Sequence, residues 1–158
     1  MRRNDRQTSE EEALDIINAA PYGVLSAVDA EGHLSTTPVS PVLMDGALYF
    51  HSTSEEGDRA RAIAAHPYVS VCFVARCEIV ADRYTIDYRS AVVRGTCTRV
   101  ADREEGERAL EAIARHYDPT CDAAATRGYI ESAYEKVSVW RVQIEELSGK
   151  AKYPKHPA

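Results

Sequence analysis

The chain has 158 residues, enough for one domain that buries roughly two-thirds of its unfolded surface without a metal or a disulfide. A formal net charge of −6 and a pI near 5.4 exclude a general binder of nucleic acid or of anionic membranes, because both partners need a basic surface. The first residues are basic, but acidic residues follow them, and no apolar run reaches the length of a membrane span. We therefore expect a soluble protein without a targeting segment.

Cysteine usage points to a reducing compartment. The four cysteines form no CxxC pair, and Cys72 and Cys97 lie inside apolar patterns typical of strands. This usage predicts reduced, mostly buried thiols in a cytoplasmic protein. No pair of histidines, cysteines or acids repeats a known ligand spacing, so no metal site is expected.

The chain opens with a helix and a strand. Ser9 and Glu12 have the spacing of a capping box, and an apolar stripe follows until Pro21 ends the helix. Residues 22–28 then predict a strand in which small residues alternate with apolar ones.

The next strand, at residues 33–42, follows a turn at residues 29–32. Pro38 and Pro41 each lack an N–H group, so this strand cannot be paired along both sides. One of its edges must therefore face either solvent or a bound ring that contacts the backbone and Ser40.

Residues 47–74 predict a strand, a polar turn, a helix and a second strand, entered through a tight hairpin at Asp45-Gly46. The turn holds two hydroxyls, a glycine and an arginine at the start of the helix, namely Ser52, Thr53, Gly57 and Arg59. These are the parts of a phosphate site, because unpaired N–H groups and the positive helix end favour an anion. A capping turn with one surface arginine explains the same residues, and spacing alone favours that interpretation because no complete phosphate-loop motif occurs.

The following segment predicts one long strand. Residues 75–83 are charged and are expected to form a loop or a hairpin end. Residues 84–100 are too many for an ordinary strand, so we expect a bend at Gly95 or at residues 87–89.

The last third predicts two helices and a final strand. Asp102 and Glu105 form a second capping box, and a weaker helix is expected at residues 127–134. Residues 136–144 alternate cleanly as the last strand, which ends near residues 148–150 and is followed by a basic tail at 151–158.

The order of these elements predicts a mainly β protein. About six strands in hairpin order, with helices at the start, between strands and before the last strand, favour an antiparallel barrel with helices packed outside it. No repeat or linker divides residues 1–158, so one domain is expected.

Five spaced blocks then suggest a family: Tyr49-Phe50-His51-Ser52, residues 56–59, residues 66–73, residues 88–95 and Gly149-Lys150. Together they resemble the flavin-binding split-barrel proteins related to pyridoxamine 5'-phosphate oxidase, and most of all the nitroimidazole-resistance branch. The resemblance implies a six-stranded split barrel and a homodimer with two FMN sites between the subunits. The flavin phosphate would lie near the turn after His51. One departure is that the usual lysine two residues after the glycine is Arg59, which keeps the charge and offers a fork suited to phosphate.

The resemblance also assigns roles to side chains. A histidine beside the flavin is a feature of the branch, so His51 is the predicted catalytic residue, with an imidazole that could donate a proton or a hydrogen bond to the substrate. The alternative is a half-buried structural histidine. The predicted cofactor-binding residues are Ser40, Ser52, Thr53, Gly57, Arg59, Tyr88, Ser90, Trp140 and Lys150. For the aromatic residues among them, core packing is the commoner role.

The function implied by the resemblance is FMN-dependent reduction of a small molecule, with nitroaromatic compounds as the substrates suggested by the branch. Two alternatives stay open. The same cleft could hold the deazaflavin F420 or haem, or the protein could store a flavin without turnover.

Overall fold

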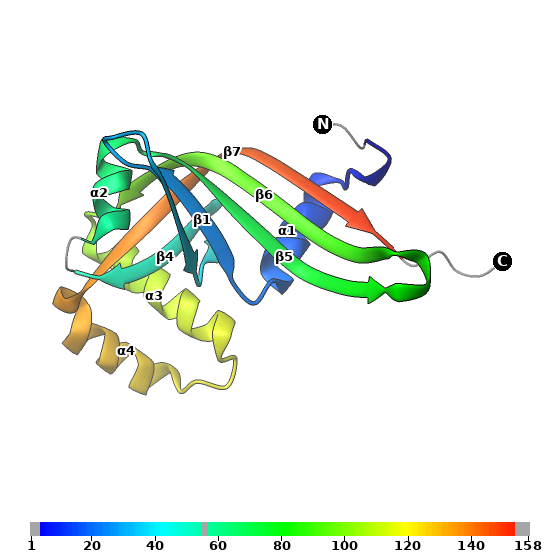
Figure 1. Cartoon of the computed structure of the whole chain (residues 1–158). Helices are drawn as coiled ribbons and strands as arrows, with labels where there is room; N and C mark the ends of the chain where they lie inside the picture. The colour runs from blue at the N-terminus through cyan, green and yellow to red at the C-terminus, as the bar shows by residue number, and fades with distance from the viewer. Residues whose placement is uncertain (1–3, 55–56, 154–158) are drawn as a thin grey trace.

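The computed structural model describes residues 4–54 and 57–153, and it is mainly β (Figure 1). Four α-helices accompany the strands: α1 (Glu10–Ala19), α2 (Asp58–Ala65), α3 (Arg103–Tyr117) and α4 (Ala123–Ala133). The strands are β1 (Gly23–Val28), β2 (Leu34–Val39), β3 (Val42–Met44), β4 (Ala47–Thr53), β5 (Tyr68–Val80), β6 (Thr85–Arg99) and β7 (Val137–Lys152). Short 3-10 turns lie at Asn4–Arg6, Ala81–Arg83 and Tyr134–Lys136.

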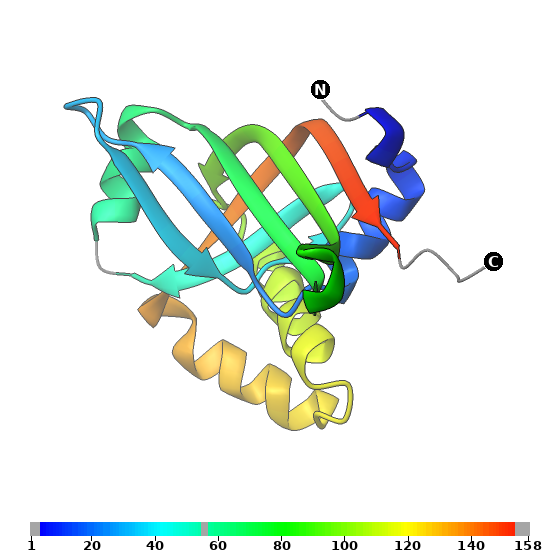
Figure 2. The ribbon, with the colours of Figure 1, turned by 45° about the vertical axis from the view of Figure 1, so that its right-hand side comes forward.

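All strands of the described chain belong to one antiparallel sheet with the order β2-β1-β5-β6-β7-β4-β3. The long strands β5, β6 and β7 form its body, and their ends extend past α1 as an arm (Figure 1). α3 and α4 lie side by side beyond β4, while α2 lies at the opposite end of the barrel from the arm (Figures 1 and 2). The predicted antiparallel sheet with outer helices is confirmed.

The sheet has seven strands rather than the predicted six, because the segment expected as one strand at residues 33–42 divides into β2 and β3. These two strands are the opposite edges of the sheet, joined by Ser40 and Pro41. A link of two residues spans at most about 11 Å, so the sheet must curl until its edges are close. The edges are not hydrogen-bonded to each other, and Pro41 lacks the N–H that such pairing would use.

Three helix starts obey the capping rules. Ser9 and Asp102 accept hydrogen bonds from the backbone N–H groups of Glu12 and Glu105, which confirms both predicted caps. Asp122 caps α4 in the same way. α2 differs, because its N-cap is Gly57, which has no side chain to satisfy the first N–H groups.

Two apolar clusters hold the structure together. The larger cluster fills the curled sheet and includes Ile16 of α1, Phe50 of β4 and Phe73 of β5. The smaller one lies between the outer side of β4 and the helices α3 and α4, and it includes Tyr49 and Ile113. β4 is thus buried on both faces until it reaches His51.

The last strands are longer than expected. Residues 75–80 are not a loop, because β5 continues to Val80 in pairing with β6, whereas residues 81–83 form the expected hairpin end. β7 includes residues 151 and 152 of the predicted tail. Their charged side chains lie on the arm, which is outside the core, so polarity does not prevent strand formation there. The rest of the predicted tail, residues 154–158, lies outside the described residues. α4 begins at Ala123, four residues before the expected start.

The predicted bends occur next to both expected positions. The pairing of β6 with β7 shifts between Arg94 and Gly95, and that of β5 with β6 shifts between Val74 and Arg76. The extra residues belong to the neighbouring strands β7 and β5. Gly95 is required, since a Cβ atom there would lie 1.8 Å from the carbonyl oxygen of Gln143.

The cysteines are free thiols, but the prediction that most are buried is wrong. Only Cys97 is buried, whereas Cys72 and Cys77 are exposed and Cys121 is intermediate. Among the residues that the structure describes, no helix is long and apolar enough to cross a membrane.

Candidate functional site

The polar end of β4 carries the first part of the site. Residues 47–50 of this strand are buried, and the strand then emerges at His51, whose side chain is exposed. Successive side chains of a strand point to opposite faces, so His51 and Ser52 face different surroundings.

His51 lies in a cavity of about 350 Å³ lined by Tyr22, Pro38, Val39, Ser40, His51 and Arg59. The fold therefore brings together three of the residues predicted from the sequence, Ser40, His51 and Arg59. They come from the link between β2 and β3, from β4 and from the first turn of α2.

Arg59 is the cation of this cavity. Its guanidinium carbon lies 5.4 Å from the centroid of the Phe50 ring, and no acidic partner is found for it among the described residues. Burial lowers the pKa of Arg59, but an arginine starts so far above neutrality that it stays charged. A half-buried, unpaired guanidinium favours an anion at this position.

The electrostatics also set the protonation of His51. Partial desolvation of its ring, and then the charge of Arg59, lower the pKa of His51 from its ordinary value of 6.5. The imidazole is therefore mostly neutral at pH 7, with one nitrogen donating and the other accepting.

Ser52 has other partners. Its hydroxyl accepts a hydrogen bond of 3.0 Å from the indole Nε1 of Trp140 and donates to the carbonyl of Thr53 at 3.0 Å. The Trp140 ring is stacked on Phe50 in the core. The Ser52 hydroxyl is therefore already engaged by Trp140. Thr53 is exposed, and Gly57 leaves the N-terminus of α2 without a side-chain cap.

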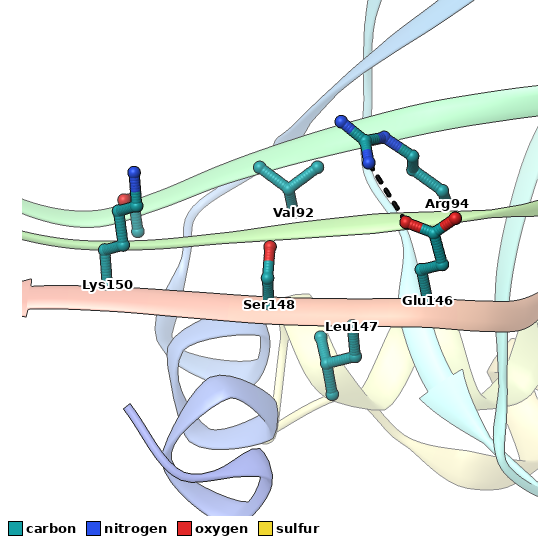
Figure 3. A pocket seen from close by; sticks show the side chains of 7 residues that line it. Val92, Arg94, Glu146, Leu147, Ser148 and Lys150 are labelled. Atoms are coloured by element: carbon teal, nitrogen blue, oxygen red, sulfur yellow. Dashed lines mark hydrogen bonds and ion pairs between the residues drawn. The ribbon is translucent and has the colours of Figure 1, made fainter. Parts of the chain in front are cut away.

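The remaining predicted residues lie elsewhere in the chain. Ser90 and Lys150 are direct partners on β6 and β7 and line a cavity of about 520 Å³ on the outer face of the sheet. Figure 3 shows Val92, Ser148 and Lys150 on one side of these strands, with the 3.0 Å pair of Arg94 and Glu146 beside them.

Tyr88 lies on the arm and belongs to neither cavity. Its hydroxyl accepts a hydrogen bond of 3.4 Å from Arg6, whose guanidinium carbon lies 6.0 Å from the ring centroid.

Two tyrosines of the site were missed by the sequence interpretation. Tyr22 lines the His51 cavity, and the Tyr117 hydroxyl donates to the Pro41 carbonyl at 3.1 Å and so fixes the link that carries Ser40. Tyr22 could have been recognised as an aromatic residue directly after Pro21, at the start of the predicted strand. Tyr117 had none, because its contact joins the end of α3 to a link far away in the sequence.

No group of three or more histidines, cysteines, aspartates or glutamates that could hold a metal ion is found within residues 4–54 and 57–153.

The antiparallel sheet with flanking helices is consistent with the fold of the split-barrel proteins. A family model for pyridoxamine 5'-phosphate oxidase matches residues 9–151, and the chain therefore belongs to that family, as the sequence blocks predicted. Among curated proteins, none matches the chain significantly.

Solved structures agree with this assignment. A proposed 5-nitroimidazole antibiotic resistance protein from Bacteroides thetaiotaomicron is 26% identical, with a TM-score of 0.72 over 90% of this chain and 83% of that one. An FAD-binding protein from Mesorhizobium loti is 21% identical, with a TM-score of 0.67 over 94% and 98% of the two chains. An FAD- and haem-binding protein from Mycobacterium smegmatis is 18% identical, with a TM-score of 0.72 over 96% and 77%. The last two likenesses concern the fold alone.

Proposed function

We propose that the protein is an FMN-dependent oxidoreductase that reduces nitroaromatic compounds, with the flavin in the cavity of Ser40, His51 and Arg59. The observation that carries the proposal is that Arg59, which has no acidic partner among the described residues, lies at the N-terminus of α2, where no side chain caps the helix, and beside an exposed histidine. Arg59 and the first N–H groups of α2 would bind the phosphate, because both favour an anion.

The residues of the cavity fit such a group. Val39, Pro38 and Tyr22 offer apolar walls for a ring, and the Ser40 hydroxyl offers a polar contact at its edge. FMN, when bound, supplies the electron transfer, while the protein binds, orients and excludes water. Ser52 would have to give up its bond with Trp140 to reach the phosphate, so we assign binding to Arg59 and the backbone instead.

His51 would act on the substrate side. Its side chain faces away from Ser52, and its neutral imidazole can donate a hydrogen bond from one nitrogen at pH 7. We assign it to the nitro group of the acceptor, to which it would donate a hydrogen bond or, once protonated, a proton.

We further propose that the protein is a homodimer in which the site is shared. Ser90 and Lys150 lie on a different surface from Arg59, so one chain does not bring all predicted residues together. That surface is partly apolar and open, with Val74 of the adjacent strand 48% exposed. A second copy laid on this face would cover it and bring Lys150 of the partner toward the flavin.

Absorption of the purified protein tests the cofactor. Bound FMN should give a band at about 450 nm. The decrease in free FMN as protein is added should give the dissociation constant. A protein that binds F420 or haem but not FMN would contradict the proposal. Reduction by a nicotinamide followed by consumption of a nitroimidazole separates the enzyme from a flavin store, which would show neither step.

A further inference from the structure

A second cavity shares α2 as a wall but none of its lining residues with the His51 cavity. Its volume is about 420 Å³, within the range of small-molecule sites. Its lining comprises Ser54, Ala60, Arg61, Ile63, Ala64, Pro67, Cys97, Thr98, Arg99, Ser138 and Trp140.

The floor of this cavity is apolar. Ile63, Cys97 and Trp140 are all buried members of the core. Burial raises the pKa of the Cys97 thiol to about 12, against the opposing charge of Arg59, so the thiol stays protonated at neutral pH. Cys97 is therefore a wall of the cavity and not a nucleophile.

Ser138 is the unusual polar group. The residue is only 4% exposed and it lines the cavity, so its hydroxyl is a polar group in a mostly apolar wall. Asp87, the other buried polar residue of the described chain, has a partner in Lys152 at 3.2 Å. A hydroxyl at this position offers a ligand one directional hydrogen bond within the cavity.

A cation lies on the same side of the sheet. Cys97 and Arg99 alternate onto one face of β6, and Arg99 is directly opposite Trp140 of β7, which shares its face with Ser138. Arg99 is exposed and has no acidic partner among the described residues. Arg61, at the rim, is already paired with Asp58.

We propose that this cavity binds a small monocarboxylate with an apolar body. Arg99 and the Ser138 hydroxyl would hold the carboxylate, and Ile63, Cys97 and Trp140 would contact the body. One unpaired guanidinium matches a single negative charge, whereas a phosphate dianion would bring a second charge to a mostly apolar cavity.

Trp140 provides the measurement, since it is the only tryptophan of the chain and lines the cavity. Titration with 3-phenylpropionate should change its fluorescence in a saturable way. The uncharged 3-phenylpropanamide should bind at least about 10-fold more weakly, because it cannot form the charge-assisted bond with Arg99.

Variants identify the groups. Arg99→Gln should weaken binding of the acid by about 10-fold or more and leave the amide unchanged. Ser138→Ala should weaken the acid by about 2- to 12-fold. Arg83→Gln, which removes an exposed arginine of the arm, is the matched control and should bind the acid as the wild type does.

Three results would overturn the proposal: no saturable change with the acid, equal affinity for acid and amide, or equal affinity in wild type and Arg99→Gln. Because Arg99 is exposed, its replacement should not disturb folding, which circular dichroism of the variant checks. The result is independent of FMN binding, which is measured at another cavity.

Discussion

The end of β4 and the outer face of β6 and β7 collect predicted residues in different ways. Ser40, His51 and Arg59 come from three separate segments and converge on one cavity. Ser90 and Lys150 are neighbours simply because their strands are paired. Convergence places a half-buried arginine beside a histidine in a cavity of about 350 Å³, whereas pairing places Ser90 and Lys150 side by side in a cavity of about 520 Å³.

The two regions also differ in support. β4 is held from its outer side by the 2.7 Å hydrogen bond of Tyr49 to Glu105, and the link beside it by Tyr117. On the outer face of β6 and β7, Arg94 and Glu146 form an ion pair between exposed side chains. Such a pair contributes little to stability. The first region therefore has more interactions that hold its shape than the second.

The largest expected effect concerns His51. His51→Ala should slow consumption of a nitroaromatic acceptor by about 10² to 10⁴, the contribution of a general acid, with FMN still bound and the dimer intact. Because the pKa of His51 is lowered, the imidazolium form, and with it the rate, should increase as the pH falls below 6.5. Stopped-flow measurement at matched flavin occupancy decides this, and an unchanged rate would return His51 to a structural role.

A charge introduced on the outer face of β6 and β7 should weaken dimerisation. Val92→Glu would place like charges close together where two copies meet, and should weaken dimerisation by about 100-fold or more. Sedimentation at a series of concentrations measures this, with Leu34→Glu on the exposed edge strand as control. A wild-type protein that is a folded monomer with FMN bound at micromolar concentration would contradict a shared site.

Removing the Arg59 cation should weaken FMN binding in the His51 cavity without affecting folding. Arg59→Ala should weaken FMN binding by about 1.5 to 3 kcal/mol, the range for a hydrogen bond to a charged group, and hardly change folding. Lys150→Ala gives the comparison for the other region, with a smaller loss that depends on dimerisation. Equal FMN affinity in wild type and Arg59→Ala would remove Arg59 from the site.

The smallest effect is expected behind β4. Tyr49→Phe removes the bond to Glu105 and should cost about 1.5 kcal/mol of stability while leaving FMN affinity unchanged. Burial, and then Glu105, raise the pKa of Tyr49 to about 12, so the folded protein keeps a proton that the unfolded chain releases near pH 10. Wild-type stability should therefore fall between pH 10 and 12, and chemical denaturation should show a shallower fall in Tyr49→Phe.

Sequence patterns predicted what depends on neighbours in the chain. The caps at Ser9 and Asp102 and the hairpin at Asp45-Gly46, where both residues have positive φ, each follow from a few adjacent residues. The two prolines correctly indicated an incompletely paired strand. They did not reveal that Val39 and Val42 lie on opposite edges of the sheet, because strand order is decided by long-range pairing.

The candidate site was predictable to a similar extent. The resemblance supplied His51 from one block of sequence, Arg59 was proposed from the polar turn that follows it, and Ser40 was proposed from the unpaired edge. The separation of Ser90 and Lys150 from them is a property of the curled sheet, which periodicity does not contain. The Trp140 bond to Ser52 joins β7 to β4, and no local pattern indicates it.

The pairing of β4 with β7 has a consequence for synthesis on the ribosome. Phe50 lies opposite Trp140, and before β7 is made the only strand beside β4 is β3, which has three residues. The strand that carries His51 can therefore complete its pairing only after nearly the whole chain has been translated. Contacts of such long range also form slowly. A nascent chain that stops before Val137 lacks that support, so the capacity to hold a flavin should be acquired only as the C-terminal strand leaves the ribosome.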